Sequence, residues 1–428
     1  MQDEKLTRRV AGMVATGLKA ARPEEVRDPR SKKGRKRDLV PMLNLLLVSM
    51  MAGQKSLAET ETLSTQLSTQ TAQRLKLKGR VPDTTLRDLV VRLMPEDICG
   101  LIRRIAQAAF RRKAFETDFP LNVVAMDGKV TAVEDVNSPW AQNQRSPDRL
   151  KVHGLVRTIT CTLVMAMGRP LLEVIPMGAK SNEMGFFRTA FTRLLTHHRA
   201  AFDVITYDAG ANCATNAKAV VDNGKDYVFA LKNENRFLMQ KAIEVLGHKP
   251  NNTSLAFTED VESKRDNLRT FRYLHMAEVP TGYKAMKSVR TVLRVHAQRL
   301  DGQGKPAFEE TRYFISSLKH NRLTPEQWLK LIRQHWGVEV THNILDTSFE
   351  EDDRPYLTHS AQGMLVMLLL RRVAYNLLTL WKGRTLTSDE SRAAPWKTVF
   401  GWVQRALEQA SEAAWNNLRE RKACPAFA

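Results

Sequence analysis

Cysteine is scarce in this chain and shows no pairing. The four cysteines, Cys99, Cys161, Cys213 and Cys424, stand far apart, so no Cys-x-x-Cys pair begins a zinc ribbon or a redox motif. The ten histidines show no His-x-x-x-His or Cys pairing of the kind that marks zinc sites. We therefore expect reduced thiols, as in a cytoplasmic protein.

The sequence also lacks a long uninterrupted apolar run. The longest, 39–52, is broken by Pro41 and Asn44 and is too short to span a bilayer. The first twenty residues carry charges throughout and have neither the apolar core nor the cleavage site of a secretory signal. These absences predict a cytoplasmic protein with no membrane partner.

Acidic residues are few relative to basic ones. The chain has 66 Lys and Arg against 46 Asp and Glu, which gives a net charge of +20. Its 428 residues, 43% of them hydrophobic, are enough for two or three globular domains. The charge excess indicates a polyanionic partner, and nucleic acid fits it better than a membrane does.

Residues 1–116 show helical spacing of apolar positions and are predicted to form a helical N-terminal DNA-binding domain. Within it, 28–37 packs basic residues around a Pro and a Gly. Such a loop either contacts DNA phosphates or is a solvated turn. Its candidate DNA-binding residues are Lys32, Lys33, Arg35, Lys36 and Arg37.

From residue 117 the pattern changes to short strands. We predict strands at 122–126, 155–165, 171–177, 204–207 and 227–231, with helices at about 184–198 and 212–221. This order suggests a mixed α/β sheet of the ribonuclease-H-like kind, although other α/β folds share that much. We place the catalytic domain at 117–385.

Three further segments complete the predicted organisation. An inserted β-rich subdomain is expected at about 250–320, within the catalytic domain. Helices return from Pro325, and 364–378 is apolar nearly all round, which predicts a buried helix. A helical tail is expected at 386–428.

Two acids follow strand-like runs. Asp127 follows an apolar run and precedes Gly128, which would let the backbone turn and leave the carboxylate free to face a metal. Asp208 repeats the arrangement, whereas Asp203 begins its strand and would lie at the opposite end of the sheet. The plain alternative for Asp127 is an aspartate that starts a turn.

A third acid, Glu339, lies in a segment predicted to be helical. Residues three and four apart share a helical face, so the polar stripe contains His335, Trp336, Glu339, His342, Asn343 and Asp346. A solvated face is the alternative, and Asp346 competes with Glu339 for the role of third ligand. Three carboxylates suit phosphodiester chemistry, because Mg²⁺ prefers oxygen ligands and two such ions can activate the attacking oxygen and stabilise the leaving one.

A set of motifs resembles the DDE-class insertion-sequence transposases, in particular the group that contains the H-repeat-associated proteins. The resemblance spans most of the chain. Its motifs are Asp-Pro-Arg at 28–30 with the basic and Leu-rich residues after it, Thr-Thr-Leu-Arg at 84–87, Met-Asp-Gly-Lys at 126–129, Lys-Ser-Asn-Glu at 180–183, Asp-Tyr-Val-Phe-Ala-Leu-Lys at 226–232, Arg-Tyr-Phe-Ile-Ser-Ser at 312–317, His-Trp-Gly-Val-Glu at 335–339, Leu-Asp at 345–346 and Phe-Glu-Glu-Asp at 349–352.

The resemblance implies a metal-binding triad of Asp127, Asp208 and Glu339 and a ribonuclease-H-like fold with a β insertion. It also implies two Mg²⁺ ions, for which Mn²⁺ could substitute, and a homodimer bridged by double-stranded DNA from transposon ends and target. Ile332, His335 and Asp346 stand where some better-known relatives have Tyr, Arg and Lys, so the phosphate contacts of those residues do not carry over.

Further candidates for contacts with DNA phosphates are Lys129, Lys180, Lys232 and Arg333, although a lysine at a strand end is commonly just solvated. The function expected from the sequence is a transposase that cuts transposon ends and joins them to target DNA. The alternatives are a decayed or recruited DNA-binding relative and a ribonuclease-H-like nuclease that cuts without joining.

Overall fold

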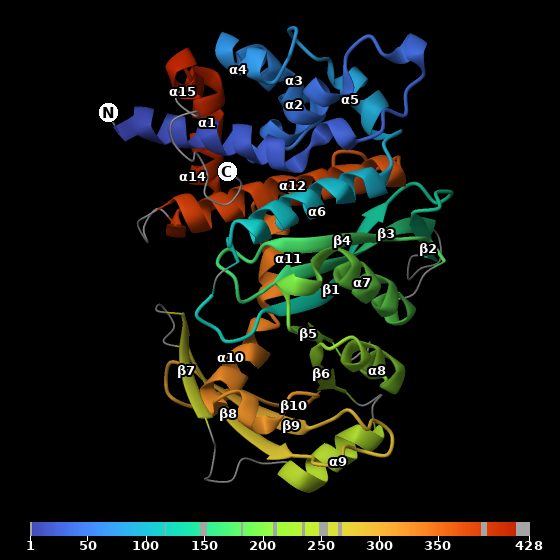
Figure 1. Cartoon of the computed structure of the whole chain (residues 1–428), viewed down its shortest axis with the longest axis vertical. Helices are drawn as coiled ribbons and strands as arrows, with labels where there is room; N and C mark the ends of the chain where they lie inside the picture. The colour runs from blue at the N-terminus through green and yellow to red at the C-terminus, as the bar shows by residue number, and fades with distance from the viewer. Residues whose placement is uncertain are drawn as a thin grey trace.

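The computed structural model describes residues 2–115, 117–145, 152–180, 183–208, 212–232, 236–247, 256–263, 268–386 and 392–416. A helical layer lies at one end of the elongated molecule, a mixed sheet runs through the middle, and a set of long antiparallel strands lies at the other end (Figure 1). The helical layer contains segments from both ends of the chain.

Five strands form the central part of a ten-stranded sheet, in the order β4-β3-β1-β5-β6. β1 is antiparallel to β3 and parallel to β5, and β5 is parallel to β6. This is the ribonuclease-H-like arrangement, and it confirms the predicted fold class. The strands are β1 Val123–Val133, β2 Ala141–Arg145, β3 Val152–Leu163, β4 Leu171–Met177, β5 Val204–Tyr207 and β6 Asp226–Leu231.

Alternation along the strands separates two cores. In β1, Val124 and Met126 belong to the larger core, whereas Val123 and Ala125 pack with α10 (Pro325–Gln334). Successive side chains of a strand point to opposite faces, so Asp127 shares the α10 face with Val123 and Ala125. β5 shows the same alternation. Val204 belongs to the α10 core, and Asp208, an even number of residues later, falls on the same face of the sheet.

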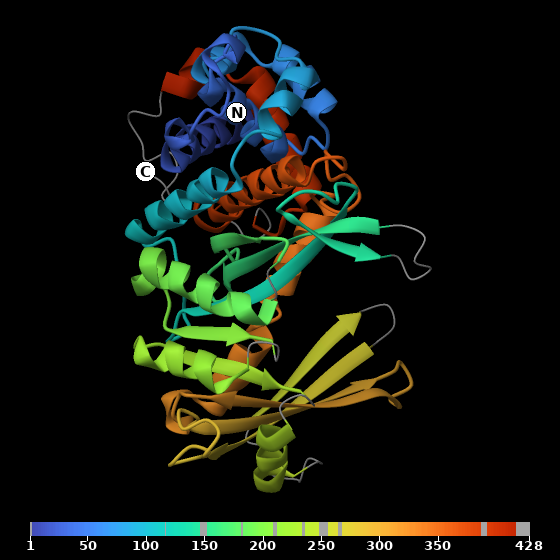
Figure 2. The ribbon, with the colours of Figure 1, turned by 90° about the vertical axis from the view of Figure 1, so that its right-hand side faces the viewer.

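The predicted β-rich segment is present, and its strands continue the central sheet. β10 pairs antiparallel with β6, with Phe314 opposite Ala230, and the order then runs β10-β9-β8-β7. α10 and α11 (Gly337–Thr347) lie beside the sheet where its two halves meet (Figure 2). The strands are β7 Ala256–Ser263, β8 Leu268–Glu278, β9 Thr291–Leu300 and β10 Pro306–Ser316.

The helical layer joins the two ends of the chain. α6 and α12 cover β4, and α1 packs against α6, α14 and α15. The predicted helical tail therefore packs on the predicted N-terminal domain, as far as residue 416; residues 417–428, with Cys424, lie outside the described residues. The helices are α1 Gln2–Ala21, α2 Leu39–Met51, α3 Leu57–Gln66, α4 Thr69–Arg74, α5 Asp83–Val90, α6 Pro95–Arg111, α7 Glu183–His198, α8 Ala214–Asp222, α9 Arg236–Leu246, α12 Ala361–Thr385, α14 Trp396–Gln409 and α15 Glu412–Asn416, with short 3-10 turns η1 Pro23–Glu25, η2 Lys32–Gly34, η3 Arg199–Ala201 and η6 His320–Arg322.

α12 is the buried helix that the sequence predicts at 364–378. Its stretch Ala361–Arg384 is long and apolar enough to cross a membrane, yet its most apolar part is buried inside the protein. It also holds Arg372, whose guanidinium forms a buried ion pair with Glu351 at 2.9 Å. These features are those of a core helix.

Candidate active site

Asp127 lies where β1 loses one of its two neighbours. Met126 is the last residue of β1 that pairs with β5, opposite Tyr207, while pairing with β3 continues to Val133. The prediction that the strand ends at Asp127 was therefore wrong, because β3 keeps the backbone paired beyond it. Gly128 pairs with Ile159 and has no left-handed φ, so it makes no turn here.

Asp208 directly follows β5, as predicted, at the end of the sheet where Asp127 lies. Its Oδ2 is 2.6 Å from Nζ of Lys232, which directly follows β6, and both side chains are about half exposed. Asp203 lies at the opposite end of β5, where its Oδ2 accepts a hydrogen bond from the backbone of Asn122. The two strand ends thus carry a carboxylate and an ammonium side by side.

Glu339 lies in the first turn of α11, which packs against β1 and β3. Partial burial and the nearby charge of Asp127 raise the pKa of the Glu339 carboxyl, with a further contribution from Asp208. Arg312 and His342 act in the opposite direction. One cavity of about 670 Å³ contains all three carboxylates, and we call it the acid cavity; its lining residues are Asp127, Asp208, Ala230, Leu231, Lys232, Met239, Glu310, Thr311, Arg312, Phe314, His335, Trp336 and Glu339.

Two histidines support the acid cavity from the α10–α11 side. His342 Nδ1 lies 3.3 Å from Asp127 Oδ2, and His335 Nδ1 is 2.9 Å from Thr206 Oγ1. Burial lowers the pKa of the His335 imidazole, although Asp127 and Asp208 oppose the shift. The predicted continuous stripe is interrupted, since α10 ends at Gln334 and α11 begins at Gly337, which leaves His335 and Trp336 in the turn between the helices.

Asp346 does not line the acid cavity. Lys129 Nζ forms an ion pair with Asp346 and also lies 3.4 Å from Asp352 and 3.7 Å from Glu351. Burial raises the pKa of the Asp346 carboxyl, and Lys129 opposes that shift. The geometry favours Glu339 over Asp346 as the third acid. Lys129 is only 8% exposed among these three carboxylates, so it does not offer its charge to a phosphate as predicted.

The donor set of the acid cavity suits a hard divalent cation, because three carboxylates open on one space. Within the described part of the chain, no three His, Cys, Asp or Glu side chains stand close enough together to hold a metal ion as arranged. The charges of the two aspartates are instead met by Lys232 and by His342 when it is protonated. The residues fit a metal by their chemistry and by the cavity they share.

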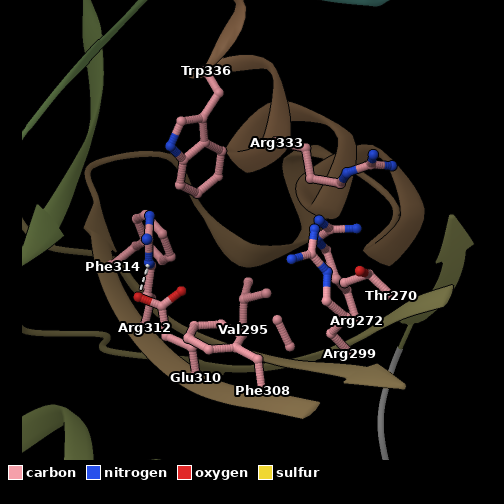
Figure 3. A pocket seen from close by; sticks show the side chains of 11 residues that line it. Thr270, Arg272, Val295, Arg299, Phe308, Glu310, Arg312, Phe314, Arg333 and Trp336 are labelled. Carbon is pink, nitrogen blue, oxygen red and sulfur yellow. Dashed lines mark hydrogen bonds and ion pairs between the residues drawn. The ribbon is translucent and has the colours of Figure 1, made fainter. Parts of the chain in front are cut away.

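A second pocket adjoins the acid cavity on one face of β8, β9 and β10 (Figure 3). Across the strands, Thr270 stands opposite Arg299, and Arg272 opposite Ala297. The small side chain of Ala297 also lines this pocket, which measures about 510 Å³. We call it the arginine pocket; its charged and aromatic lining residues are Arg272, Arg299, Phe308, Glu310, Arg312, Phe314, Arg333 and Trp336.

The arginine pocket and the acid cavity share Glu310, Arg312, Phe314 and Trp336, so they form neighbouring parts of one depression. The guanidinium of Arg312 lies 4.8 Å from the ring centroid of Trp336 and 2.6 Å from Glu310. In Figure 3, Arg272, Arg299 and Arg333 gather on the opposite side of the pocket from Arg312. Of these four arginines the sequence singled out only Arg333.

The remaining predicted DNA contacts lie away from the acid cavity. Lys180 is exposed in the turn after β4, and Ser181 and Asn182 of its motif lie outside the described residues. In the basic loop, Lys32 and Lys33 are exposed in a single 3-10 turn, and Lys36 is exposed after it. Arg37 is half-buried. Arg35 pairs with Asp28 at 3.4 Å, so it belongs to the loop's own framework.

The chain was compared with known families and structures. Residues 118–377, which include all three acids of the cavity and more than half of the chain, match the sequence model of the family described as Transposase DDE domain. Among solved structures, the chain is similar to the piggyBac transposase in a cryo-EM structure of its synaptic complex with hairpin DNA, at 12% identity and a TM-score of 0.43, over 98% of this chain and 84% of that one. No curated protein matches the chain.

Proposed function

The chain belongs to the Transposase DDE domain family, and we propose that it cuts DNA at the ends of a mobile element and joins those ends to target DNA. The observation that carries this proposal is the acid cavity. Asp127, Asp208 and Glu339 come from three separate elements and line one space. A carboxyl group in a cleft with a raised pKa, such as that of Glu339, is typical of functional sites.

In this proposal Asp127, Asp208 and Glu339 hold two Mg²⁺ ions, for which Mn²⁺ could substitute. When bound, such ions would activate the attacking oxygen, first of water and then of a DNA 3′-hydroxyl, and stabilise the leaving oxygen. His342 would hold the Asp127 carboxylate in place through its 3.3 Å contact. Lys232 pairs with Asp208, and it would become available to a phosphate if a cation took its place at the carboxylate.

The arginine pocket would hold the DNA strand that adjoins the acid cavity. Four arginines against one glutamate give the pocket a positive balance, and phosphates are the commonest partners of arginine in DNA complexes. Because Arg312 and Trp336 line both spaces, a strand that leaves the acids would run past these two side chains into the arginine pocket. Two copies of the chain would be bridged by DNA, as the resemblance implies.

The test uses the full chain with a duplex that carries the end of its element, a target duplex and Mg²⁺. We expect cut and joined products from the wild type and neither product from Asp127→Asn or Asp208→Asn, because an amide keeps the shape of the side chain but loses the charge that holds Mg²⁺. DNA binding should persist, since it depends on spread phosphate contacts. Asp203→Asn is the matched control, because Asp203 lies at the other end of β5.

The alternatives give different products. A nuclease without joining activity would leave cut DNA and no joined DNA, and a decayed relative would bind DNA without cutting it. Joined products from either aspartate variant would contradict the assignment of the acids.

A further inference from the structure

The basic loop between η1 and α2 is held in one shape by two of its own arginines. The guanidinium of Arg30 donates two hydrogen bonds to the Asp28 carboxylate, from Nε to Oδ1 at 2.9 Å and from Nη2 to Oδ2 at 2.9 Å. The same Nη2 donates to the carbonyl of Arg37 at 2.8 Å. Arg35 donates to the carbonyls of Arg30 and Asp28. The hydrogen bond from Arg30 lowers the pKa of the Asp28 carboxyl, which strengthens the closure. A loop closed in this way is ordered before any partner arrives.

The other cations of this loop have different surroundings. Lys32, Lys33 and Lys36 are exposed, and their ammonium groups make no hydrogen bond or ion pair with any residue that the structure describes. Arg30, by contrast, is only 7% exposed. The basic residues of the loop therefore have two roles. Arg30 and Arg35 fix its shape, and the lysines remain available to a partner.

α5 presents a polar face to this loop. Thr85, Asp88 and Arg92 follow one another at spacings of three and four, so they share one side of α5 and of the turn after it. The adjacent side, with Leu86 and Leu89, is buried, and α5 packs against α3 and α12. The polar face and the loop enclose a cleft of about 520 Å³ with the lining residues Arg30, Lys36, Arg37, Thr85, Asp88 and Arg92.

The lining of this cleft indicates the class of its ligand. All of its described lining residues are polar or charged. Arg30 is already paired with Asp28, which leaves Lys36, Arg37 and Arg92 against Asp88, so an anion fits and an apolar small molecule does not. Exposed cations continue beyond the cleft, namely Lys32 and Lys33 on the loop. A single phosphate would leave them unused, whereas a row of phosphates would contact them together.

We infer that the 28–37 loop and the polar face of α5 bind the backbone of duplex DNA, at a site separate from the acid cavity. The inference rests on the proposed function, because it takes DNA as the partner. α5 lies in the helical layer, on the far side of α12 from β1 (Figure 1). The duplex bound here is therefore a segment away from the cleavage point, and the site would anchor an element end while its terminus lies at the acids.

The test compares the full-length wild type with the double variant Lys36→Ala/Arg92→Ala. The probe is a fluorescent duplex that carries the end of the element, and its affinity is measured over a series of NaCl concentrations without divalent metal. Each lost phosphate contact should reduce the slope of log affinity against log salt by about one, so we expect a reduction of about two for the double variant. Both side chains are exposed in part, so the fold should survive, and an unchanged Tm checks it.

The matched control is Lys19→Ala/Lys397→Ala, which removes the same charge from exposed positions on α1 and α14, outside the cleft. We expect its salt slope to equal that of the wild type. Equal slopes for both double variants would overturn the inference while leaving the cleavage assay, and so the proposed function, intact. Failure of the wild type to bind any duplex would overturn both.

Discussion

Lys129 on β1 and Asp346 on α11 form an ion pair that ties the strand carrying Asp127 to the helix carrying Glu339. Lys129 shares a face of β1 with Asp127, and Asp346 lies two turns beyond Glu339 on α11. The same ammonium faces Glu351, which Arg372 binds from α12. The position of the third acid thus depends on a charge network beneath the acid cavity.

Replacing Lys129 with Met should destabilise the protein by about 3 to 5 kcal/mol, because it leaves a group of partly buried carboxylates with one cation fewer. Asp346→Asn should cost less. The double variant should be less destabilised than the sum of the single variants by about 0.5 to 3 kcal/mol. Urea unfolding measures all three, with Lys218→Met as control, since the ion pair of Lys218 with Asp222 is exposed. Strictly additive effects would mean that the pair does not act as a unit.

Glu339→Gln should abolish metal-dependent cleavage, because Glu339 lines the cavity that holds both aspartates. Asp346→Asn should retain measurable cleavage, since Asp346 acts only through the placement of α11. The assay compares initial cleavage rates of the two variants at saturating Mg²⁺. If Asp346→Asn were inactive and Glu339→Gln active, the third acid would have been assigned to the wrong residue.

Lys232→Met should lower the Mg²⁺ concentration required for half-maximal cleavage and also lower the maximal rate. The ammonium of Lys232 competes with a cation for the Asp208 carboxylate, and it is a candidate phosphate contact once displaced. Lys232→Arg, which keeps the charge, should change both quantities less. A variant that needs more Mg²⁺ than the wild type would show that Lys232 assists metal binding instead.

Burial lowers the pKa of the Lys55 ammonium, which donates to the carbonyl of Ser348, to about 8. An unfolded lysine titrates near pH 10.4, so the unfolded chain binds more protons between about pH 8 and about pH 10.4, and stability rises with pH in that window. Relative to Lys55→Met, the free energy of unfolding of the wild type should therefore rise by up to about 3 kcal/mol from about pH 7 to about pH 10. Lys19→Met, at an exposed site on α1, is the control substitution. A flat difference for Lys55→Met would contradict the shifted pKa.

Local patterns were enough to find the acids but not their surroundings. The apolar runs before Asp127 and Asp208 predict strands, and the parity of those strands puts both carboxylates on one face. The continuation of β1 to Val133 could not be seen, because it depends on β3, a partner distant in sequence. The burial of Lys129 was missed for the same reason, since its carboxylate partners lie more than two hundred residues away.

The arginine pocket shows a different limit of the sequence. Arg272, Arg299 and Arg312 occur singly in three strands. Arg272 and Arg299 come close because β8 pairs with β9, in a register that puts Arg299 opposite Thr270 and Arg272 opposite Ala297. The β-rich subdomain that holds β8, β9 and β10 was predicted at about 250–320, but the pairing of its strands was not. The antiparallel registers of β8 with β9 and of β9 with β10 put these arginines on a common face. The sequence shows the arginines, but it does not show these registers.

The packing of α14 and α15 against α1 has a consequence for synthesis on the ribosome. α1 emerges before the sheet and the three acids, and α14 emerges after them, so the apolar side of α1 must wait for its partner until the whole catalytic part has been made. A product that stopped before Trp396 would carry the acids and the sheet but expose the apolar surface that α14 covers on α1 and α2. Copies of the chain that stop before α14 are therefore expected to aggregate or be degraded rather than act on DNA.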